Sequence, residues 1–384
     1  MTRLSQIKIV FIITGLNQGG AEAMLYKLLS SIDKEKFAPV VITLLDGGIY
    51  KSKIENLGVP VYSSCMKRGR FSIIGFCLLV KLLRNLKPDL LQGWMYHGNL
   101  IAQLSSVFLK KKISVLWNIR GTHTNLSEEK FTSAVTMWLG ARLSSLPVYI
   151  INNSQASALS HEQKLNYRTG KWIIIPNGFD TSLFVPSDEN RLKFRSDLGL
   201  PKDAFLIGLV ARYHPMKDHT NFLYAAVDIL KTHPNIHFIL VGTDVEPSNT
   251  ELMEKINTFG LGKSFHVLGN RDDIPYLTSA LDIASSSSYG EGFPNVVGEA
   301  MSCGVSCVVT KVGDADWIVG DTGIVVPPRD PVSLANGWRK LIELGQDKRL
   351  ALGMMARQRI IKKFSLDDVV KKYEMLYKEI IGRN

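Results

Sequence analysis

The chain has 384 residues, of which 45% are hydrophobic and 21% charged, a composition typical of a soluble globular protein with more than one core. No run of about 18 apolar residues is present, which excludes a membrane-spanning helix. The net charge of +11 lies in the first half, because residues 1–180 hold 22 Lys and Arg against 10 Asp and Glu, and residues 181–384 hold 24 against 25. This asymmetry predicts an anionic partner for the first half.

Short apolar segments alternate with polar loops and helical patterns through the first half. Strands are expected at 7–14, 38–45, 60–63, 89–92, 113–120, 148–153 and 172–176. A glycine-rich loop at 15–20 lies between the first strand and a helix at 21–31, an arrangement that lets backbone approach a phosphate, although the dinucleotide-binding spacing G-x-G-x-x-G is absent. The alternation predicts a doubly wound parallel sheet.

A basic segment at 67–87 contributes much of the positive charge. Basic residues at 67, 68 and 70 precede the apolar run 71–80, and Lys81, Arg84 and Lys87 follow it. The run is too short to span a bilayer, so it is either an interfacial helix on an anionic membrane or a core helix with a solvated basic end. Nucleic acid is not expected as a partner, because no basic groove with interleaved aromatic residues is present.

Turn residues dominate 177–201, which indicates a domain junction. Beyond it, strands are expected at 204–209, 236–241, 265–268, 281–285 and 305–310, with a helix at 220–230, so a second doubly wound domain is predicted. The last segment, 366–381, has apolar residues at helical spacing. The predicted division is 1–177, 178–362 and a helical 363–384.

Residues 285–301, SSSSYGEGFPNVVGEAM, combine a strand end, a serine-rich loop and a helix. The helix is expected to have Pro294 in its first turn and to stop at Cys303-Gly304. Its first backbone N–H groups, at 295–297, suit a phosphate. Glu291 and Glu299 flank the Gly-Phe-Pro turn, where carboxylates suit sugar hydroxyls; a surface glutamate and a helix glutamate without a ligand are the alternative.

Four stretches, in this order, resemble family 4 glycosyltransferases: G-G-A-E at 19–22, N-G-F-D at 177–180, A-R-Y-H-P-M-K-D at 211–218 and E-G-F-P-N-V-V-G-E-A at 291–300. The resemblance covers nearly the whole chain. It implies an α/β GT-B architecture with two facing Rossmann-like domains, an interdomain cleft and a C-terminal helix that packs back toward the N-terminal domain. It also implies a retaining enzyme, similar to bacterial enzymes that build O-antigen, capsule or exopolysaccharide.

The resemblance places the nucleotide sugar mainly on the second domain. Arg212 and Lys217 match the residues that neutralise the diphosphate, whose charge grows as it leaves. Glu291 matches the ligand of the sugar hydroxyls, and Glu299 matches the ligand of the ribose. The remaining expected contacts are Gly19 and Gly20 at the phosphates, Asn270 and Arg271 at the base, and Gly292, Phe293, Pro294, Asn295 and Val296 at the sugar and phosphate.

The catalytic groups are less sharply implied, because the family lacks an agreed protein nucleophile. Glu291 is therefore assigned to positioning of the sugar. Many members carry a histidine near the strand that ends here at Arg120, with His123 three residues later, so Arg120 either supplies positive charge beside the donor or forms a strand-end ion pair. His97, at another strand-to-helix turn, is either an acceptor-binding residue or a structural histidine.

No metal cofactor is expected, because no Asp-x-Asp motif stands at a comparable strand end. The four cysteines are scattered, which suits a reducing cytoplasm, and Cys303 and Cys307 are interpreted as buried thiols. His214 and His219 are interpreted as loop and helix-start residues.

The sequence thus predicts transfer of a hexosyl group from a nucleoside-diphosphate sugar, with UDP favoured, to a saccharide acceptor carried on a polyprenyl diphosphate. The expected location is the cytoplasm, with peripheral attachment to the anionic inner face of the membrane. The alternatives are a GT-B enzyme that acts on the nucleotide sugar alone, such as a hydrolysing epimerase, and a non-catalytic nucleotide-sugar-binding protein.

Overall fold

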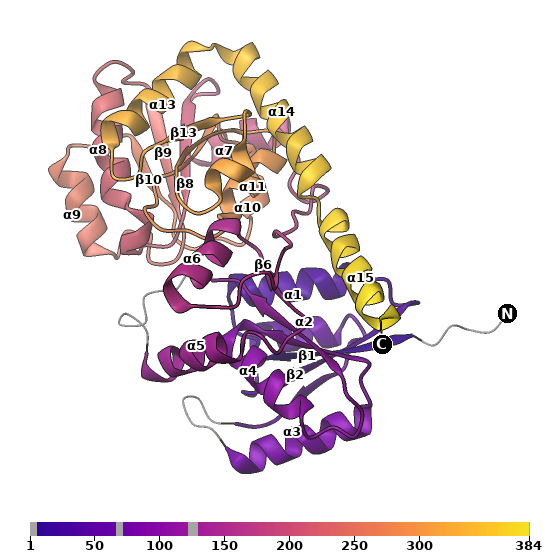
Figure 1. Cartoon of the computed structure of the whole chain (residues 1–384). Coiled ribbons are helices and arrows are strands. Elements are labelled where there is room, and N and C mark those ends of the chain that lie inside the picture. Colours follow the sequence, from indigo (N-terminus) through magenta and orange to yellow (C-terminus); the bar gives the residue numbers. More distant parts are fainter. Residues whose placement is uncertain (1–5, 67–71, 122–129, 384) are drawn as a thin grey trace. The chain divides into compact units, whose positions relative to one another are not determined.

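Two structural units make up the computed structural model, which describes residues 6–66, 72–121 and 130–383. Unit 1 comprises Met1–Gly178 and Leu366–Asn384, and unit 2 comprises Phe179–Ser365. The described strands form two parallel sheets, one of seven strands and one of six (Figure 1). The predicted α/β architecture with two doubly wound domains is therefore confirmed.

The sheet of unit 1 has the order β3-β2-β1-β4-β5-β6-β7. Its strands are apolar and largely buried, as expected for a parallel sheet covered on both faces. Their bounds are β1 (Ile7–Ile13), β2 (Phe37–Thr43), β3 (Val61–Ser63), β4 (Leu90–Trp94), β5 (Ser114–Ile119), β6 (Tyr149–Asn152) and β7 (Trp172–Ile174). All seven predicted strands of this half are present, with small shifts at their ends. The order reverses between β1 and β4, which opens a crevice at the carboxyl ends of these strands.

Helices cover both faces of this sheet. One core joins the sheet to α1 (Gly20–Ser31), α2 (Ile49–Glu55) and α15 (Leu366–Gly382). The other joins it to α3 (Ile73–Leu86), α4 (Met95–Ser106), α5 (Phe131–Leu143) and α6 (Gln155–Leu165). The described helices therefore sit on the two faces that a doubly wound sheet requires.

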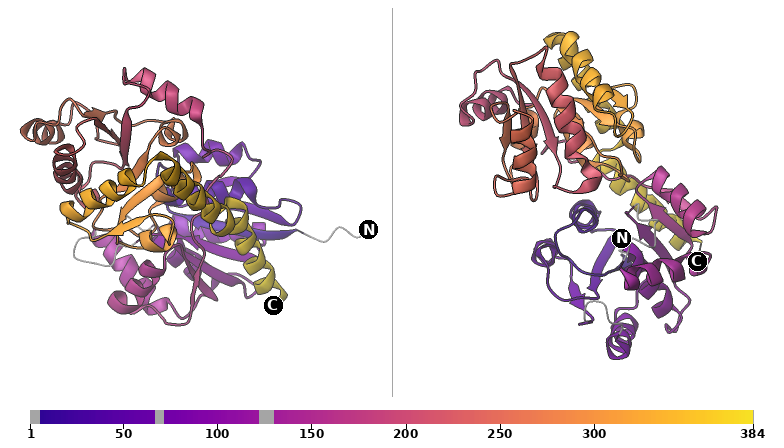
Figure 2. Two further views of the ribbon diagram at one scale, coloured as in Figure 1. Left: turned by 90° about the horizontal axis from the view of Figure 1, so that it is seen from above. Right: turned by 90° about the vertical axis from the view of Figure 1, so that its left-hand side faces the viewer.

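The C-terminal helix α15 belongs to unit 1, although it follows unit 2 in the chain. Its apolar stripe, which includes Val369, Tyr373 and Tyr377, is buried against α1 and the sheet. The Tyr377 hydroxyl donates to Oε1 of Gln92. Figures 1 and 2 show this helix in yellow beside the indigo elements of unit 1. The predicted return of the helix to the N-terminal domain is confirmed.

The sheet of unit 2 has the order β10-β9-β8-β11-β12-β13 and reverses between β8 and β11. Its strands are β8 (Phe205–Val210), β9 (Ile236–Val241), β10 (Phe265–Val267), β11 (Ile283–Ser286), β12 (Ser306–Thr310) and β13 (Ile324–Val326). The helices are α7 (Asp188–Asp197), α8 (His219–Leu230), α9 (Thr250–Thr258), α10 (Ile274–Ser279), α11 (Asn295–Ser302), α12 (Ala315–Val319), α13 (Pro331–Glu343) and α14 (Gln346–Lys363).

Three local predictions for unit 2 need correction. Strand β13 was not predicted, although its Ile-Val-Val run lies between a glycine and a proline and β3, β7 and β10 are equally short. Pro294 is the extended N-cap of α11, with φ −73° and ψ 101°, and does not lie in the first turn. The segment predicted as a loop after β8 contains a 3-10 turn, η2 (Pro215–Lys217), where Nδ1 of His214 accepts the Met216 N–H at 3.2 Å.

Candidate functional site

The candidate site of unit 2 lies at the carboxyl ends of β8 and β11, the two central strands between which the order reverses. The loop after β8 carries Arg212 and η2, and the loop after β11 leads through Glu291 to α11. Two stretches that lie far apart in the sequence thus meet at one edge of the sheet.

Lys217 and Glu291 form an ion pair in which the lysine Nζ donates to Oε1 of the carboxylate. Their side chains are 22% and 13% exposed, so the pair is only partly hydrated. Ser288 Oγ donates to the same carboxylate oxygen at 2.7 Å. The site therefore holds one cation and one carboxylate, each partly withdrawn from water, where charges interact more strongly than at an open surface.

The serine-rich run after β11 positions both partners. Ser287 Oγ donates to the carbonyl oxygen of Lys217 at 2.8 Å, and the Tyr289 N–H donates to the carbonyl of Met216 at 2.9 Å. Sequence reasoning treated this run as a polar loop and missed Ser287 and Ser288 as supports of the site. The available signal was the row of small polar residues directly after a buried strand.

The Gly-Phe-Pro turn fixes the backbone next to Glu291. Phe293 is buried and stacks on Phe179, with ring centroids 6.1 Å apart, so only its backbone is placed for ligand contact. The Asp314 N–H donates to the carbonyl of Gly292 at 2.8 Å. Gly313, at φ +54°, leaves room for this turn, since a Cβ there would lie 2.4 Å from the Gly292 oxygen. The turn is therefore held by core packing and by its neighbour loop.

Helix α11 carries the remaining predicted ligands. Three backbone N–H groups, at 295–297, were predicted to suit a phosphate. One of them, the Val297 N–H, instead donates to the carbonyl of Pro294 at 3.3 Å. Glu299 is half-buried on the helix, and its carbonyl accepts the Cys303 N–H at 3.1 Å. Burial, and then the charge of Glu299, raise the pKa of the Cys303 thiol to about 12. Cys307 is also buried, and burial raises its pKa to about 12. Both cysteines are buried thiols, as predicted.

Residues predicted for the diphosphate and the base follow the carboxyl ends of β8 and β10, which are separated by β9 in the sheet. Arg212 is exposed after β8, and Asn270 is exposed after β10. Arg271 turns back on its own loop, where Nε donates to Oδ1 of Asp273 at 2.7 Å. That contact raises the pKa of the guanidinium and lowers the pKa of Asp273. Arg271 therefore shapes the loop, and its contact with a base stays a prediction.

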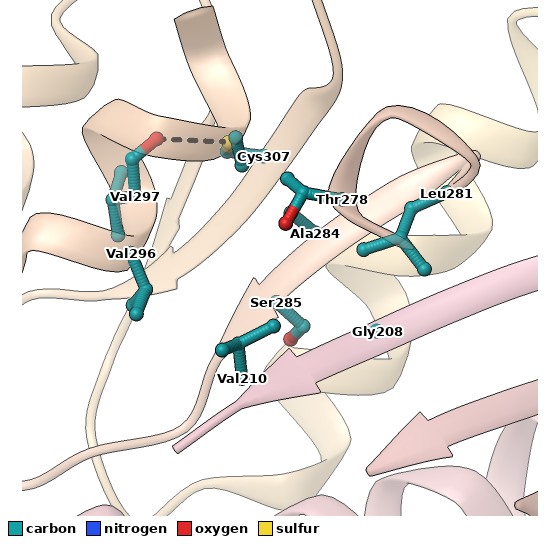
Figure 3. A pocket seen from close by; sticks show the side chains of 10 residues that line it. Gly208, Val210, Thr278, Leu281, Ala284, Ser285, Val296, Val297 and Cys307 are labelled. Carbon is teal, nitrogen blue, oxygen red and sulfur yellow. Dashed lines mark hydrogen bonds between the residues drawn. The ribbon is translucent and has the colours of Figure 1, made fainter. Parts of the chain in front are cut away.

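A small cavity of about 20 Å³ lies beneath this edge, between β8, β11 and α11 (Figure 3). Val210, Ser285 and Val296 line it, and Sγ of Cys307 lies 3.9 Å from the Val297 carbonyl beside it. Ligand pockets are larger by an order of magnitude, at about 300–1,000 Å³. This space is a packing defect under α11 and cannot hold a sugar nucleotide.

Arg120, in unit 1, is held by neutral partners. Its Nη1 donates to the Tyr373 hydroxyl at 3.0 Å, its Nη2 donates to Oδ1 of Asn177, and its guanidinium lies 5.2 Å from the Trp94 ring centroid. Within the described residues no carboxylate pairs with it, so the predicted strand-end ion pair is absent there. His123 lies outside the described residues.

The other predicted residues of unit 1 lie at the carboxyl ends of β1 and β4. Gly19 is the N-cap of α1, and a Cβ there would lie 2.4 Å from Oε2 of Glu22, so the glycine leaves room for that carboxylate. Gly20 is the exposed first residue of the helix. His97, on α4, lines a cavity of about 850 Å³. Burial lowers the pKa of His97, which keeps the imidazole neutral at pH 7.

Metal ligands are not gathered anywhere in the part of the chain that the structure describes. No group of three or more His, Cys, Asp or Glu side chains there could hold a metal ion.

Comparison with known proteins identifies the domains. A family profile described as "Glycosyltransferase Family 4" matches residues 18–183, and one described as "Glycosyl transferases group 1" matches residues 204–344.

Two curated relatives match most of the chain. The UDP-Gal:alpha-D-GlcNAc-diphosphoundecaprenol alpha-1,3-galactosyltransferase of Escherichia coli is 25% identical over 311 residues, which cover 79% of this chain and 78% of the relative. The putative glycosyltransferase EpsF of Bacillus subtilis (strain 168) is 24% identical over 317 residues, 80% of this chain and 79% of the relative. Among solved structures, Anabaena HepE in complex with UDP has a TM-score of 0.85 and 23% identity, covering 97% of this chain and 100% of that chain, which shows the same fold.

Proposed function

The chain is a glycosyltransferase that joins a family 4 domain to a group 1 domain, and from this premise we propose that it transfers a hexosyl group from a UDP-sugar to a lipid-linked saccharide in surface polysaccharide synthesis. The bond between C1 of the sugar and the diphosphate oxygen breaks, and an acceptor hydroxyl oxygen bonds to C1 on the same face. Because the new bond forms on the face that the diphosphate leaves, the configuration is retained. The hydroxyl proton passes to the departing diphosphate, so no protein base is required.

The observation that carries this proposal is the Lys217–Glu291 pair at the switch point of unit 2. An incoming diphosphate replaces Glu291 as the ion-pair partner of Lys217, and the released carboxylate then accepts hydrogen bonds from sugar hydroxyls. As C1 and the diphosphate separate, negative charge grows on the leaving oxygen beside the lysine, which is where a preorganised cation lowers the barrier. Arg212, exposed on the same loop, adds a second cation for the diphosphate.

Two comparisons support the choice of donor and acceptor. The Escherichia coli relative is named for UDP-Gal as donor and for a GlcNAc-diphosphoundecaprenol acceptor, and the HepE structure contains UDP. No metal is assigned to the reaction, because lysine and arginine supply the positive charge that a divalent ion would otherwise bring to the diphosphate.

Helix α3 supports attachment of unit 1 to an anionic membrane surface. Ser72 caps the helix by accepting the Gly75 N–H at 3.1 Å. Ile73 and Ile74 are 73% and 76% exposed, and the basic Lys81 and Arg84 are exposed further along the helix. An exposed apolar end followed by lysine and arginine is typical of an interfacial helix. Among the described helices none is long and apolar enough to cross a bilayer.

Transfer of labelled hexose from UDP-sugars to a diphosphoundecaprenol-linked GlcNAc tests the reaction. Lys217→Ala and Glu291→Ala are expected to abolish transfer while the protein stays folded. Lys231→Ala and Asp228→Ala are the matched controls, because they remove a surface ion pair of the same unit, 3.3 Å apart, and should leave the rate unchanged. Wild-type turnover in either site variant, or UDP release that needs no acceptor, would contradict the proposal.

Membrane attachment has its own test. The full chain should sediment with vesicles that contain anionic lipid more than with neutral vesicles, and high salt should weaken the binding. Ile74→Glu should reduce it. Equal partitioning to the two kinds of vesicle would rule out the electrostatic attachment.

A further inference from the structure

The cavity of about 850 Å³ in unit 1 lies at the crevice where the strand order reverses between β1 and β4. Its size is that of a pocket for a substantial organic ligand, roughly 300–1,000 Å³. The residues that line it come from the loops after β1, β2 and β3, from helices α1, α4 and α5, and from Lys130 before α5. They are Thr14, Gly15, Asn17, Glu22, Leu44, Leu45, Met66, His97, Leu100, Ile101, Leu104, Lys130, Phe131, Thr132, Ser133, Val135, Thr136 and Leu139.

One end of this cavity is polar. Asn17 and Glu22 come from the loop and helix that follow β1, and His97 comes from the first turn of α4. Burial raises the pKa of the Glu22 carboxyl, and His97 is also partly buried. Partly buried carboxylate, amide and imidazole groups that face an open space are suited to hydrogen bonds with sugar hydroxyls.

The other end is mainly apolar. Helix α4 continues from His97 to Leu100 and Leu104, and helix α5 continues from Phe131 to Val135 and Leu139. At three-to-four-residue spacing these side chains share one face of each helix, and each stripe runs for about 10–12 Å away from the strand ends. The two helices contact each other, and Figure 1 shows them as neighbours. The cavity therefore has its ionisable groups at the sheet edge. Between the helices, the apolar wall of α4 faces a wall of α5 in which Thr132, Ser133 and Thr136 alternate with the apolar side chains.

The apolar walls are open to the surroundings. Phe131 is 83% exposed, and Leu104 and Val135 are each 38% exposed. Beyond Leu104, α4 ends near Phe108, whose ring packs on Phe76 of α3 at 5.7 Å between centroids. Phe108 thus connects the end of the groove to the helix whose exposed face we assign to the membrane. Exposed apolar side chains that adjoin one another mark a binding surface more often than singly scattered ones do.

We propose that this cavity binds the lipid-linked acceptor as an amphiphile, with the saccharide at Asn17, Glu22 and His97 and the first isoprenoid units of the carrier between α4 and α5. This inference rests on the proposed function for the acceptor class, and it adds the place where the lipid chain lies. Lys130 is the only lysine or arginine among the described lining residues, and it is the N-cap of α5. A cation there suits the diphosphate that joins sugar to lipid.

The test compares two acceptors with the same saccharide diphosphate, one on undecaprenol and one on a short water-soluble alkyl chain, with the full-length protein in detergent micelles. Leu104→Asp and Val135→Asp place a charge on the apolar walls at partly exposed positions that tolerate it. Leu159→Asp, at a 52% exposed leucine on α6 outside the cavity, is the matched control. The expected result is at least a tenfold rise in KM for the undecaprenol acceptor, with kcat and KM for the short acceptor unchanged and with no change in the control.

The outcomes separate the two proposals. If the wild type transfers to neither acceptor, the proposed function fails. If it transfers to both with the same KM, or if the two groove variants keep the wild-type preference for the long chain, the groove assignment fails while the function stands. A loss of activity on both acceptors alike, in variants that circular dichroism shows to be folded, would also overturn the groove assignment. If the two variants are unfolded, Leu100→Phe replaces them, because it narrows the groove without adding a charge. The same comparison of KM for the two acceptors then decides.

Discussion

Strand β11 separates two carboxylates that differ in their surroundings. Asp282, directly before the strand, is 2% exposed, and it pairs with Arg195 at 2.7 Å, with Arg349 at 3.6 Å and with Arg191. Its Oδ2 also accepts the Leu206 N–H at 2.8 Å. Glu291, beyond the other end of the strand, has one lysine and one serine and keeps part of its side chain exposed.

The difference is the one expected between a structural cluster and the proposed ligand site. The partners of Asp282 come from α7, α14 and β8, so the carboxylate closes the core at the amino ends of the strands and has no room for a ligand. The Glu291 carboxylate has one partly exposed lysine partner at the carboxyl ends of the strands, where parallel sheets bind ligands, and we propose that a diphosphate displaces it. Buried charge alone therefore does not mark function; an exchangeable partner at the switch point does.

The largest expected effect is a loss of stability from a substitution of Asp282, at the amino end of β11. Asp282→Asn leaves three arginines without their carboxylate, and removal of one partner from a buried ion cluster costs about 3–5 kcal/mol of unfolding free energy. Urea or thermal unfolding measures it. Asp228→Asn is the control, because that carboxylate is 36% exposed and its pairs are worth about 1 kcal/mol or less. Equal losses of unfolding free energy in the two variants would show that the Asp282 cluster stabilises the fold no more than a surface ion pair does.

A charge exchange at the carboxyl end comes next. Lys217→Glu combined with Glu291→Lys restores the ion pair but places a carboxylate where the diphosphate needs a cation. Transfer should stay lower by at least roughly 10²–10³-fold, the usual cost of one lost group that stabilises developing charge, because the new carboxylate also repels the diphosphate. The melting temperature should return close to that of the wild type, and steady-state rates with thermal unfolding measure both. Recovery of transfer would show that the pair acts through stability.

Acid sensitivity should arise at His219, which is buried at the start of α8. Burial, and then the charges of Lys217 and Lys255, lower its pKa to about 4. The unfolded chain binds a proton below about pH 6.5 and the folded chain does not until about pH 4, so stability falls as pH drops through this window, by about 3 kcal/mol at most. His219→Gln should flatten unfolding free energy against pH between 6.5 and 4, whereas His233→Gln should leave the slope as it is.

The smallest effect is expected at Ser288. Ser288→Ala removes one hydrogen bond to the Glu291 carboxylate, worth about 1–2 kcal/mol, so KM for the donor should rise about tenfold with little change in stability. Ser302→Ala is the matched control, since that buried hydroxyl donates to the Gly298 carbonyl at 2.7 Å and touches no charged group. Unchanged donor KM in Ser288→Ala would mean that the serine does not position Glu291.

Much of the fold could be predicted because its signals are local. Runs of β-branched and apolar residues between glycine and turn residues marked the strands, and helical spacing in the last segment marked α15. The same logic missed η2, a single turn within a loop, and it missed β13, although Ile-Val-Val between a glycine and a proline is the same kind of signal. The motif order also predicted which residues of unit 2 belong to one site, because parallel strands bring the loops after them to one edge.

The sequence by itself determined the two doubly wound sheets, the residue types at the strand ends and the unequal distribution of charge. Only the tertiary structure decided which of those residues have partners. Lys217 and Glu291 are 74 positions apart, and Arg120 meets Tyr373 across 253 positions. Strand order and helix packing set such distances, and no local propensity encodes them. For the same reason, the cavity wall that α4 and α5 form together exists only once the two helices lie side by side, since each stripe alone reads as an ordinary core face.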